Sequence, residues 1–449
     1  MSVLRTDCPA PASACAATPF GQVVDRARQA GELVVQPRMG FGAPGAMRTG
    51  LVAVREAEAH TVGTITLDSY TRVGDHAAAR RALAAGEDLN GYPIVTHGPG
   101  TTRELLRGIG PFAVQVRHGS PLPLDIFGTL LDAGLDATEG GPVSYCLPYS
   151  RTPLQESVEA WARCCELLAA RSPTAHLESF GGCMLGQLCP PSLLVALALL
   201  EGLFFRQHGL GDISLSYAQQ TDFDQDAAAV AALRRLAGEL LGDTRWHVVL
   251  YTYMGVFPRT EPGALALLRH SARLAVRTGA ERLIVKTAAE AHRIPTVEDN
   301  VRSLEEAART SRLARAEGLH RLPPAPDDGV YDEARALVEA VLELDSDVGR
   351  ALTAAFARGY LDVPYCLHAD NAQRARSYID GDGRIRWLTV GSMPIRPAVP
   401  QGAARLRADD LLGMLSHIQT AFDCAALDWT QGDHRPHEPL TSRKPRRVL

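Results

Sequence analysis

The feature that most constrains this chain is a regular alternation of short β-rich runs with longer segments of helical spacing, which begins near residue 61. The spacing of Val158, Trp161, Cys165 and Leu168 is one example of a helical face. Alternation of this kind is typical of βα units around a parallel sheet. Eight β-rich runs occur, at Thr61–Leu67, Pro93–Thr96, Phe112–Val116, Gly134–Thr138, Ala175–Ser179, Asp212–Tyr217, Trp246–Tyr253 and Arg282–Lys286.

The number of these units favours a closed barrel. Eight βα units over about 250 residues match a TIM barrel, whereas a doubly wound sheet more often has about five or six strands. We therefore expect an α/β protein with a TIM (β/α)8 barrel, an N-terminal segment and a C-terminal α+β extension. A Gly-Asp-Gly turn at 381–383 predicts a hairpin in that extension. The expected divisions are an N-terminal segment at 1–54, the catalytic barrel at 55–320, the extension at 321–431 and a disordered tail at 432–449.

Composition excludes several classes of function. The chain has 46 Lys and Arg against 51 Asp and Glu, so we expect neither nucleic acid nor a membrane surface as partner. Its longest apolar run, Ser192–Phe205, is interrupted by Glu201 and is shorter than the roughly 20 residues of a membrane span. The nine cysteines form no CxxC pair, and the N-terminus has no apolar signal segment. We expect a cytoplasmic protein without a disulfide framework or zinc site.

Candidate chemistry is expected in the loops after the strands, where barrel enzymes place their active sites. Arg72 and Arg117 follow two different expected strands, and their guanidinium groups are suited to bind the two carboxylates of a dicarboxylate. The alternative is that each arginine forms an ion pair with a carboxylate at the rim. Glu139 fits either a substrate ammonium or an ion pair with Arg117, and the spacing favours neither.

Several other motifs are missing or weak. The sequence has no GxSxG, no HExxH and no His/Asp/Glu cluster at metal spacing, so hydrolysis and metal chemistry have little support. Residues 40–45 match GxGxxG, but Pro44 removes a backbone amide and no acidic strand end follows at the required distance. We therefore do not expect a dinucleotide site there. His434 and His437, in a proline-rich polar stretch, are expected to be solvated.

Several segments occur in one order along the chain: 36–40 (QPRMG), 67–72 (LDSYTR), 89–93 (LNGYP), 116–119 (VRHG), 139–149 (EGGPVSYCLPY), 253–258 (YMGVFP), 284–295 (IVKTAAEAHRIP) and 361–365 (LDVPY). Together they resemble the large, epsilon subunit of glutamate mutase, also called methylaspartate mutase, over residues 30–395. The resemblance implies an adenosylcobalamin-dependent isomerase that interconverts L-glutamate and L-threo-3-methylaspartate by a radical carbon-skeleton rearrangement. In such an enzyme the cofactor carries the difficult chemistry.

The resemblance also implies two sets of site residues. Those expected to bind substrate are Arg38, Arg72, Arg117, His118, Glu139, Tyr145 and Tyr149. Those expected to contact the cofactor are Gly40, Asn90, Pro148, Phe257, Lys286, Glu290 and Ile294.

A partner is implied as well. In the family, a small cobalamin-binding subunit supplies the cobalt's histidine ligand from an AspxHisxxGly motif, and this chain lacks that motif. We therefore expect no metal ligand here, a separate small subunit, and a heterotetramer built on a dimer of large subunits. The chain departs from the family in its short N-terminal segment, in a shortened interval between Arg72 and Asn90, and after residue 395. Two alternatives stay open: a mutase of a related amino acid, or a non-catalytic companion of a cobalamin protein.

Overall fold

A computed structural model describes residues 19–184, 188–326, 328–396 and 407–430, so the expected tail at 432–449 lies outside the described residues. Eight parallel strands follow one another in the order β1-β8-β7-β6-β5-β4-β3-β2. A parallel bridge between Val35 of β1 and Thr61, just before β2, joins the two ends of this order. This is the predicted TIM-type barrel. Its strands are β1 (Val34–Pro37), β2 (Gly63–Thr66), β3 (Val114–Arg117), β4 (Ala137–Gly140), β5 (His176–Ser179), β6 (Asp212–Ala218), β7 (Arg245–Tyr251) and β8 (Arg282–Val285).

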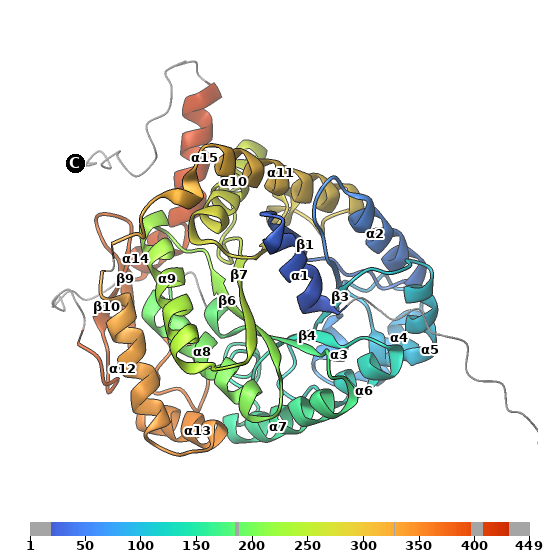
Figure 1. The fold of residues 1–449 in the computed structure, drawn as a ribbon, viewed down its shortest axis with the longest axis horizontal. Helices are drawn as coiled ribbons and strands as arrows, with labels where there is room; N and C mark the ends of the chain where they lie inside the picture. Colours follow the sequence, from blue (N-terminus) through green and yellow to red (C-terminus); the bar gives the residue numbers. More distant parts are fainter. Residues whose placement is uncertain (1–18, 185–187, 327, 397–406, 431–449) are drawn as a thin grey trace, which may run out of the picture.

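Helices form a ring around the strands (Figure 1). The outer ring contains α2 (Pro44–Glu56), α5 (Ile94–Arg107), α6 (Leu124–Ala133), α7 (Leu154–Arg171), α8 (Pro191–Gln207), α9 (Phe223–Leu240), α10 (Glu261–Thr278) and α11 (Val297–Ala316). Shorter helices lie in the connections: α3 (Ser69–Arg72), α4 (His76–Ala84), η1 (Gly181–Cys183), η2 (Ala288–Ala291) and η3 (Leu319–Arg321). Within the described residues, no helix combines the length and the apolar character needed to cross a membrane.

The first two strands differ from the sequence prediction. The expected strand at 93–96 is wrong, because Ile94–Arg107 forms α5, kinked at Gly98 with a φ of 76°. The strand that the prediction missed is β1, which lies inside the expected N-terminal segment and pairs with β8. Of the glycine-rich residues 40–45, residues 40–43 lie between β1 and α2, and Pro44 and Gly45 begin α2. A Cβ on Gly40 would lie 2.3 Å from the Thr66 carbonyl oxygen. Close packing against β2 therefore accounts for this glycine.

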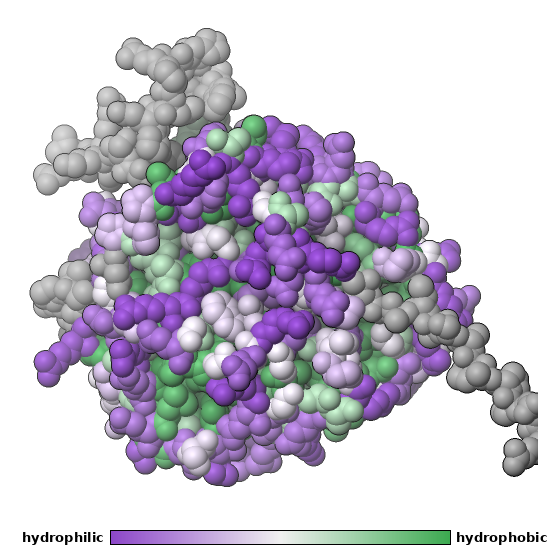
Figure 2. Space-filling view, viewed as in Figure 1, coloured by the Kyte–Doolittle hydropathy of each residue, from purple (hydrophilic) through white to green (hydrophobic). Residues whose placement is uncertain are grey.

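Helix α1 (Phe20–Gln29) crosses the end of the barrel at which the strands begin, in the centre of Figure 1. The Phe20 ring stacks on His176 at 4.9 Å, and the Arg282 guanidinium lies 5.0 Å from the same ring. A Cβ on Gly21 would clash with Asp212, so the helix packs tightly on the start of β6. Figure 2 shows that the surface at this end is mostly hydrophilic.

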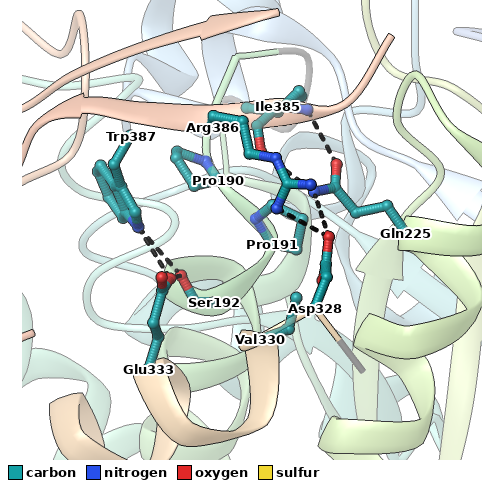
Figure 3. A pocket seen from close by; sticks show the side chains of 10 residues that line it. All are labelled: Pro190, Pro191, Ser192, Gln225, Asp328, Val330, Glu333, Ile385, Arg386 and Trp387. Carbon is teal, nitrogen blue, oxygen red and sulfur yellow. Dashed lines mark hydrogen bonds and ion pairs between the residues drawn. The ribbon is translucent and has the colours of Figure 1, made fainter. Parts of the chain in front are cut away.

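The C-terminal extension packs on the outside of the barrel. It contains α12 (Val330–Leu342) and the predicted hairpin, since β9 (Arg376–Ile379) and β10 (Ile385–Thr389) pair antiparallel. The Trp387 indole N–H contacts Ser192 Oγ at 3.3 Å and Glu333 Oε2 at 3.0 Å, while Arg386 pairs with Asp328 at 2.8 Å (Figure 3). These contacts enclose a cavity of about 20 Å³ and fix the hairpin to α8 and α12. The elements are α12 (Val330–Leu342), α13 (Val348–Arg358), β9 (Arg376–Ile379), β10 (Ile385–Thr389), α14 (Ala408–Leu415) and α15 (His417–Thr430).

Candidate active site

Three arginines converge at the carboxyl ends of β1, β2 and β3. Arg38 directly follows β1, Arg72 ends the short helix after β2, and Arg117 is the last residue of β3. Burial lowers the pKa of Arg72, and the nearby positive charges of Arg117 and Arg38 lower it further. The structure therefore brings together the arginines that the sequence singled out. Such a concentration of positive charge suits an anionic ligand.

Arg117 and Glu139 form a buried ion pair between neighbouring strands. The distance from Nε to Oε1 is 2.9 Å, and the side chains are 6% and 1% exposed. Burial alone would lower the pKa of Arg117, but Glu139 raises it well above its ordinary value, so this guanidinium stays charged. Among the described residues, Arg117 Nη1 is buried without a hydrogen-bond partner. A buried unpaired donor is costly, and here it is available for an acceptor on a ligand.

The Glu139 carboxylate is surrounded by hydroxyl donors. The hydroxyl of Tyr145 donates to Oε1, and the Tyr251 hydroxyl lies 2.7 Å from Oε2. A carboxylate has about four lone-pair sites, and Arg117 and the two tyrosines occupy at most three. At least one acceptor site is left for a ligand. Both interpretations of Glu139 are thus geometrically possible at once, because the ion pair does not consume the whole carboxylate.

Arg72 is oriented by the backbone around it. Asp68 caps the helix that carries it, accepting hydrogen bonds from the amides of Tyr70 and Thr71. The Arg72 Nε and Nη2 atoms donate to the Leu67 carbonyl at 3.0 and 2.9 Å. These two bonds hold the guanidinium plane in one orientation at the end of β2, as a site that binds carboxylates requires.

His118 is a neutral side chain beside the arginines. Burial and the charge of Arg72 lower its pKa to about 3, so it is uncharged near neutral pH. Its Nδ1 accepts the Ser120 amide hydrogen at 3.1 Å, which places the ring proton on Nε2. The ring stacks on Trp161 at 5.6 Å. His118 can therefore donate a hydrogen bond without adding charge to an already cationic site.

The loop after β4 carries the two predicted tyrosines. Tyr145 is buried, whereas Tyr149 is 55% exposed, with its ring 6.3 Å from that of Tyr145. Glu201 of α8 holds this loop, since it accepts from the amides of Val143 and Ser144 at 3.2 and 2.9 Å. Sequence reasoning gave Glu201 no role, although its place inside an apolar run was a visible signal.

A second charged cluster lies at the ends of β8 and β1. Glu290 Oε2 lies 3.3 Å from Lys286 Nζ and 3.5 Å from Arg38 Nη1. Lys286 is also 4.5 Å from the centre of the Phe257 ring, and burial lowers its pKa. Arg38 therefore connects the expected substrate residues to three of the expected cofactor residues.

The remaining expected cofactor residues lie in loops at the same end of the barrel. Ile294 is 58% exposed, Asn90 is also exposed, and Pro148 is partly buried. Next to η2, a surface cavity of about 350 Å³ is lined in part by Arg259, His292 and Arg302. That these residues and Gly40 contact a cofactor stays a prediction.

Three side chains of the kinds that bind metal ions, two histidines and an aspartate, meet at the opposite end of the barrel, under α1. His176, Asp212 and His247 are buried, with ligand atoms within 4.8 Å of one another. Arg245 lies 3.5 Å from Asp212, and Arg282 Nε donates to His247 Nε2 at 3.3 Å. Two arginines beside the group oppose cation binding, and hydrogen bonding accounts for the arrangement. The sequence gave no signal of it because the residues come from three strands.

A family model described as "Methylaspartate mutase E chain (MutE)" matches residues 16–407. The chain belongs to this family. It is 32% identical to the glutamate mutase epsilon subunit of Halobacterium salinarum over 377 residues, which cover 81% of this chain and 79% of the relative. The epsilon subunit of Escherichia coli O157:H7 is 31% identical over 350 residues, 74% of this chain and 72% of the relative. That of Desulfitobacterium hafniense is 30% identical over 363 residues, 77% and 74% of the two chains.

These matches confirm the family resemblance found in the sequence. Within the glutamate mutase epsilon-subunit family, the chain has the barrel and the convergent arginines described above. Glu178, Tyr251 and Glu201 were missed by sequence reasoning because their contacts with the site residues run across the barrel or from an outer helix.

Proposed function

We propose that this chain is the catalytic subunit of an adenosylcobalamin-dependent mutase that interconverts L-glutamate and L-threo-3-methylaspartate. The observation that carries the proposal is the convergence of Arg38, Arg72 and Arg117 beside the buried carboxylate of Glu139. A dicarboxylate with one ammonium group is complementary to three cations and one anion. Membership of the glutamate mutase epsilon-subunit family supports the same reaction class.

The residues at this site would bind and orient the substrate. The unpaired Nη1 of Arg117 and the fixed guanidinium of Arg72 would bind carboxylates, which arginine does with two parallel hydrogen bonds. The free acceptor site of Glu139 would receive the ammonium. Neutral His118 and the hydroxyls of Tyr145 and Tyr149 would complete the pocket as hydrogen-bonding groups.

The other cluster fits a large polar cofactor. Lys286 and Glu290 offer a cation and a carboxylate at the mouth of the barrel. Glu290, Lys286 and Phe257 would hold adenosylcobalamin on the side of Arg38, with Gly40, Asn90, Pro148 and Ile294 contacting it from the surrounding loops. When bound, adenosylcobalamin supplies the radical that starts the rearrangement.

A partner at the mouth is supported by exposed apolar side chains. Large hydrophobic residues that follow barrel strands are well exposed, among them Val73 at 75%, Val256 at 42% and Ile294 at 58%. Single exposed apolar side chains are common on protein surfaces, so the partner is inferred mainly from the epsilon-subunit family to which the chain belongs. We infer that a small cobalamin-binding subunit, which carries the AspxHisxxGly motif, covers this face. A heterotetramer with two large subunits, located in the cytoplasm, completes the proposal.

Reconstitution tests the proposed function. The chain is mixed with a cobalamin-binding small subunit of a glutamate mutase, adenosylcobalamin and L-glutamate, and methylaspartate is measured. Product is expected only when all four are present, and Arg117→Ala should abolish it. Activity without the small subunit would contradict the assembly. Turnover of an amino acid with a single carboxylate, in place of glutamate, would favour the related mutase. Product formation unaffected by Arg117→Ala would favour the non-catalytic companion.

A further inference from the structure

The Tyr251 hydroxyl lies between two buried carboxylates from different strands. It is 2.7 Å from Oε2 of Glu139, at the end of β4, and it also contacts Oε1 of Glu178 on β5. All three side chains are buried. Each carboxylate thus turns one oxygen toward the same phenol.

The other oxygen of each carboxylate faces an arginine. Glu139 Oε1 pairs with Arg117 at 2.9 Å, and Glu178 Oε2 pairs with Arg282. The contacts therefore run from Arg117 through Glu139, Tyr251 and Glu178 to Arg282, which is the order cation, carboxylate, phenol, carboxylate, cation. The two positive and two negative charges sum to zero, with the neutral phenol between the carboxylates, so no charge is left unpaired inside the barrel, where it would be costly.

Glu178 is fixed more firmly than Glu139. Its Oε2 also accepts from Gln115 Nε2 at 3.1 Å and lies 3.3 Å from Ser214 Oγ. Burial would raise the pKa of Glu178, but Arg282 and the hydrogen bonds from Tyr251 and Gln115 lower it below the ordinary value, so this carboxylate is ionised. The Tyr251 ring is in turn packed edge-on against Phe180 at 5.5 Å. Tyr251 is therefore supported by Phe180 and by Glu178, neither of which is among the expected substrate residues.

We propose that Tyr251 and Glu178 are positioning residues that hold Glu139 in the orientation needed to receive the substrate ammonium. The inference rests on the proposed function, because it takes Glu139 as the ammonium acceptor. A hydroxyl has one proton, so Tyr251 cannot donate to both carboxylates at the same time. The two carboxylates are therefore coupled through this hydroxyl. The orientation of Glu139 thus depends also on Glu178, which is not among the expected substrate residues.

The consequence is a specific effect on recognition of the amino group. The dicarboxylate glutarate has the two carboxylates of glutamate but no ammonium, so it depends on the arginines alone. Loss of the Tyr251 hydroxyl should weaken glutamate and leave glutarate nearly unchanged. A general loosening of the pocket would instead weaken both ligands.

The experiment uses the holoenzyme reconstituted with the small subunit and adenosylcobalamin. Glutamate kinetics, competitive inhibition by glutarate and melting temperature are measured for wild type, Tyr251→Phe and Tyr217→Phe. Tyr217 is the matched control: it is equally buried, on β6, and its hydroxyl donates to Asp226 at 2.9 Å. Tyr251→Phe should raise the glutamate KM about tenfold or more, the range expected for a hydrogen bond to a charged group, with the glutarate Ki changed less than about threefold. Tyr217→Phe should change neither.

A second variant keeps the inference testable if Tyr251→Phe does not fold. Glu178→Asp keeps the charge opposite Arg282 but withdraws the carboxylate from Tyr251, so it should shift the ratio of glutamate KM to glutarate Ki in the same direction. Equal effects on both ligands, or none, in the variant that folds would overturn the inference. The proposed function fails in a different way: wild-type holoenzyme would not turn over glutamate, or Glu139→Gln would leave the ratio unchanged.

Discussion

Arg117, the last residue of β3, and Glu139, near the end of β4, form an ion pair of 2.9 Å that is almost inaccessible to solvent. The pair leaves the Nη1 nitrogen of the arginine, which carries two N–H donors, without a partner, and at least one acceptor site of the carboxylate stays free. The structural and the ligand-binding interpretations of these residues therefore do not compete. Substitution of either residue should affect both folding and recognition.

Glu139→Gln should lower stability and activity together. The substitution leaves the buried Arg117 charge without its counter-charge, which typically costs about 3 kcal/mol or more of unfolding free energy. It also removes the negative charge proposed to receive the ammonium, so glutamate kcat/KM should fall. Denaturant unfolding and kinetics on one preparation measure both effects. Glu339→Gln is the control, because its pair with Arg335 is exposed and should contribute less than about 1 kcal/mol. Unchanged stability would show that Arg117 finds another partner.

Arg117→Lys should retain the charge but lose the guanidinium geometry. Lysine cannot present the paired donors that bind one carboxylate and Glu139 at the same time. We expect a loss of about 2–3 kcal/mol of transition-state stabilisation, measured as the ratio of kcat/KM values. Arg350→Lys, in an exposed pair with Asp345, should have no effect on the same ratio. Kinetics equal to wild type would remove Arg117 from the substrate site.

Glu290→Gln should weaken cofactor binding more than substrate binding. Without its carboxylate, Lys286 and Arg38 lose their shared counter-charge and repel each other. The apparent Kd for adenosylcobalamin, titrated in the presence of the small subunit, should rise about tenfold, the effect of losing one charge-assisted contact. The glutarate Ki should change little. A larger effect on glutarate than on the cofactor would place Glu290 in the substrate pocket instead.

The barrel was predictable because its pattern is local. Each βα unit repeats the same alternation, and most strands lie within a few residues of their predicted runs. The errors have physical causes. β1 ends in Pro37, a residue that disfavours strands, and lies ahead of the alternation that begins near residue 61, so it was not counted among the eight runs. The run at 93–96 has strand-like residues, but tertiary packing makes it the start of α5.

The site was predictable only where it touches the strand ends. Arg72, Arg117 and Glu139 follow β-rich runs, and in a barrel the carboxyl ends of the strands meet at one face. Arg38 came from the family resemblance, because its strand was missed. Tyr251 and Glu178 act through contacts across the barrel interior, and no spacing in the sequence indicates which strands face each other.

Glu201 links stability to pH through the loop that carries Tyr145. It is a fully buried carboxylate with four hydrogen-bond contacts, from the amides of Val143 and Ser144 and from the hydroxyls of Ser144 and Ser179. No salt bridge to Glu201 is found within the described residues. Burial raises its pKa from 4.5 to about 7, and the hydrogen bonds only partly oppose this.

Glu201→Gln should therefore flatten the dependence of stability on pH. Because the folded-state pKa is raised, the folded protein binds this proton more tightly than the unfolded chain. That advantage is complete below about pH 4.5 and is lost as the pH rises through 7. Between pH 5 and 8 the wild type should lose about 2–3 kcal/mol of unfolding free energy from this group, and Glu201→Gln should not.

Glutamine preserves the contacts, since its oxygen can accept from both amides and its NH2 group can donate to both hydroxyls. Denaturant unfolding at several pH values, with Glu339→Gln as an exposed control, measures the slope. Equal slopes in wild type and Glu201→Gln would show that Glu201 stays ionised throughout this range.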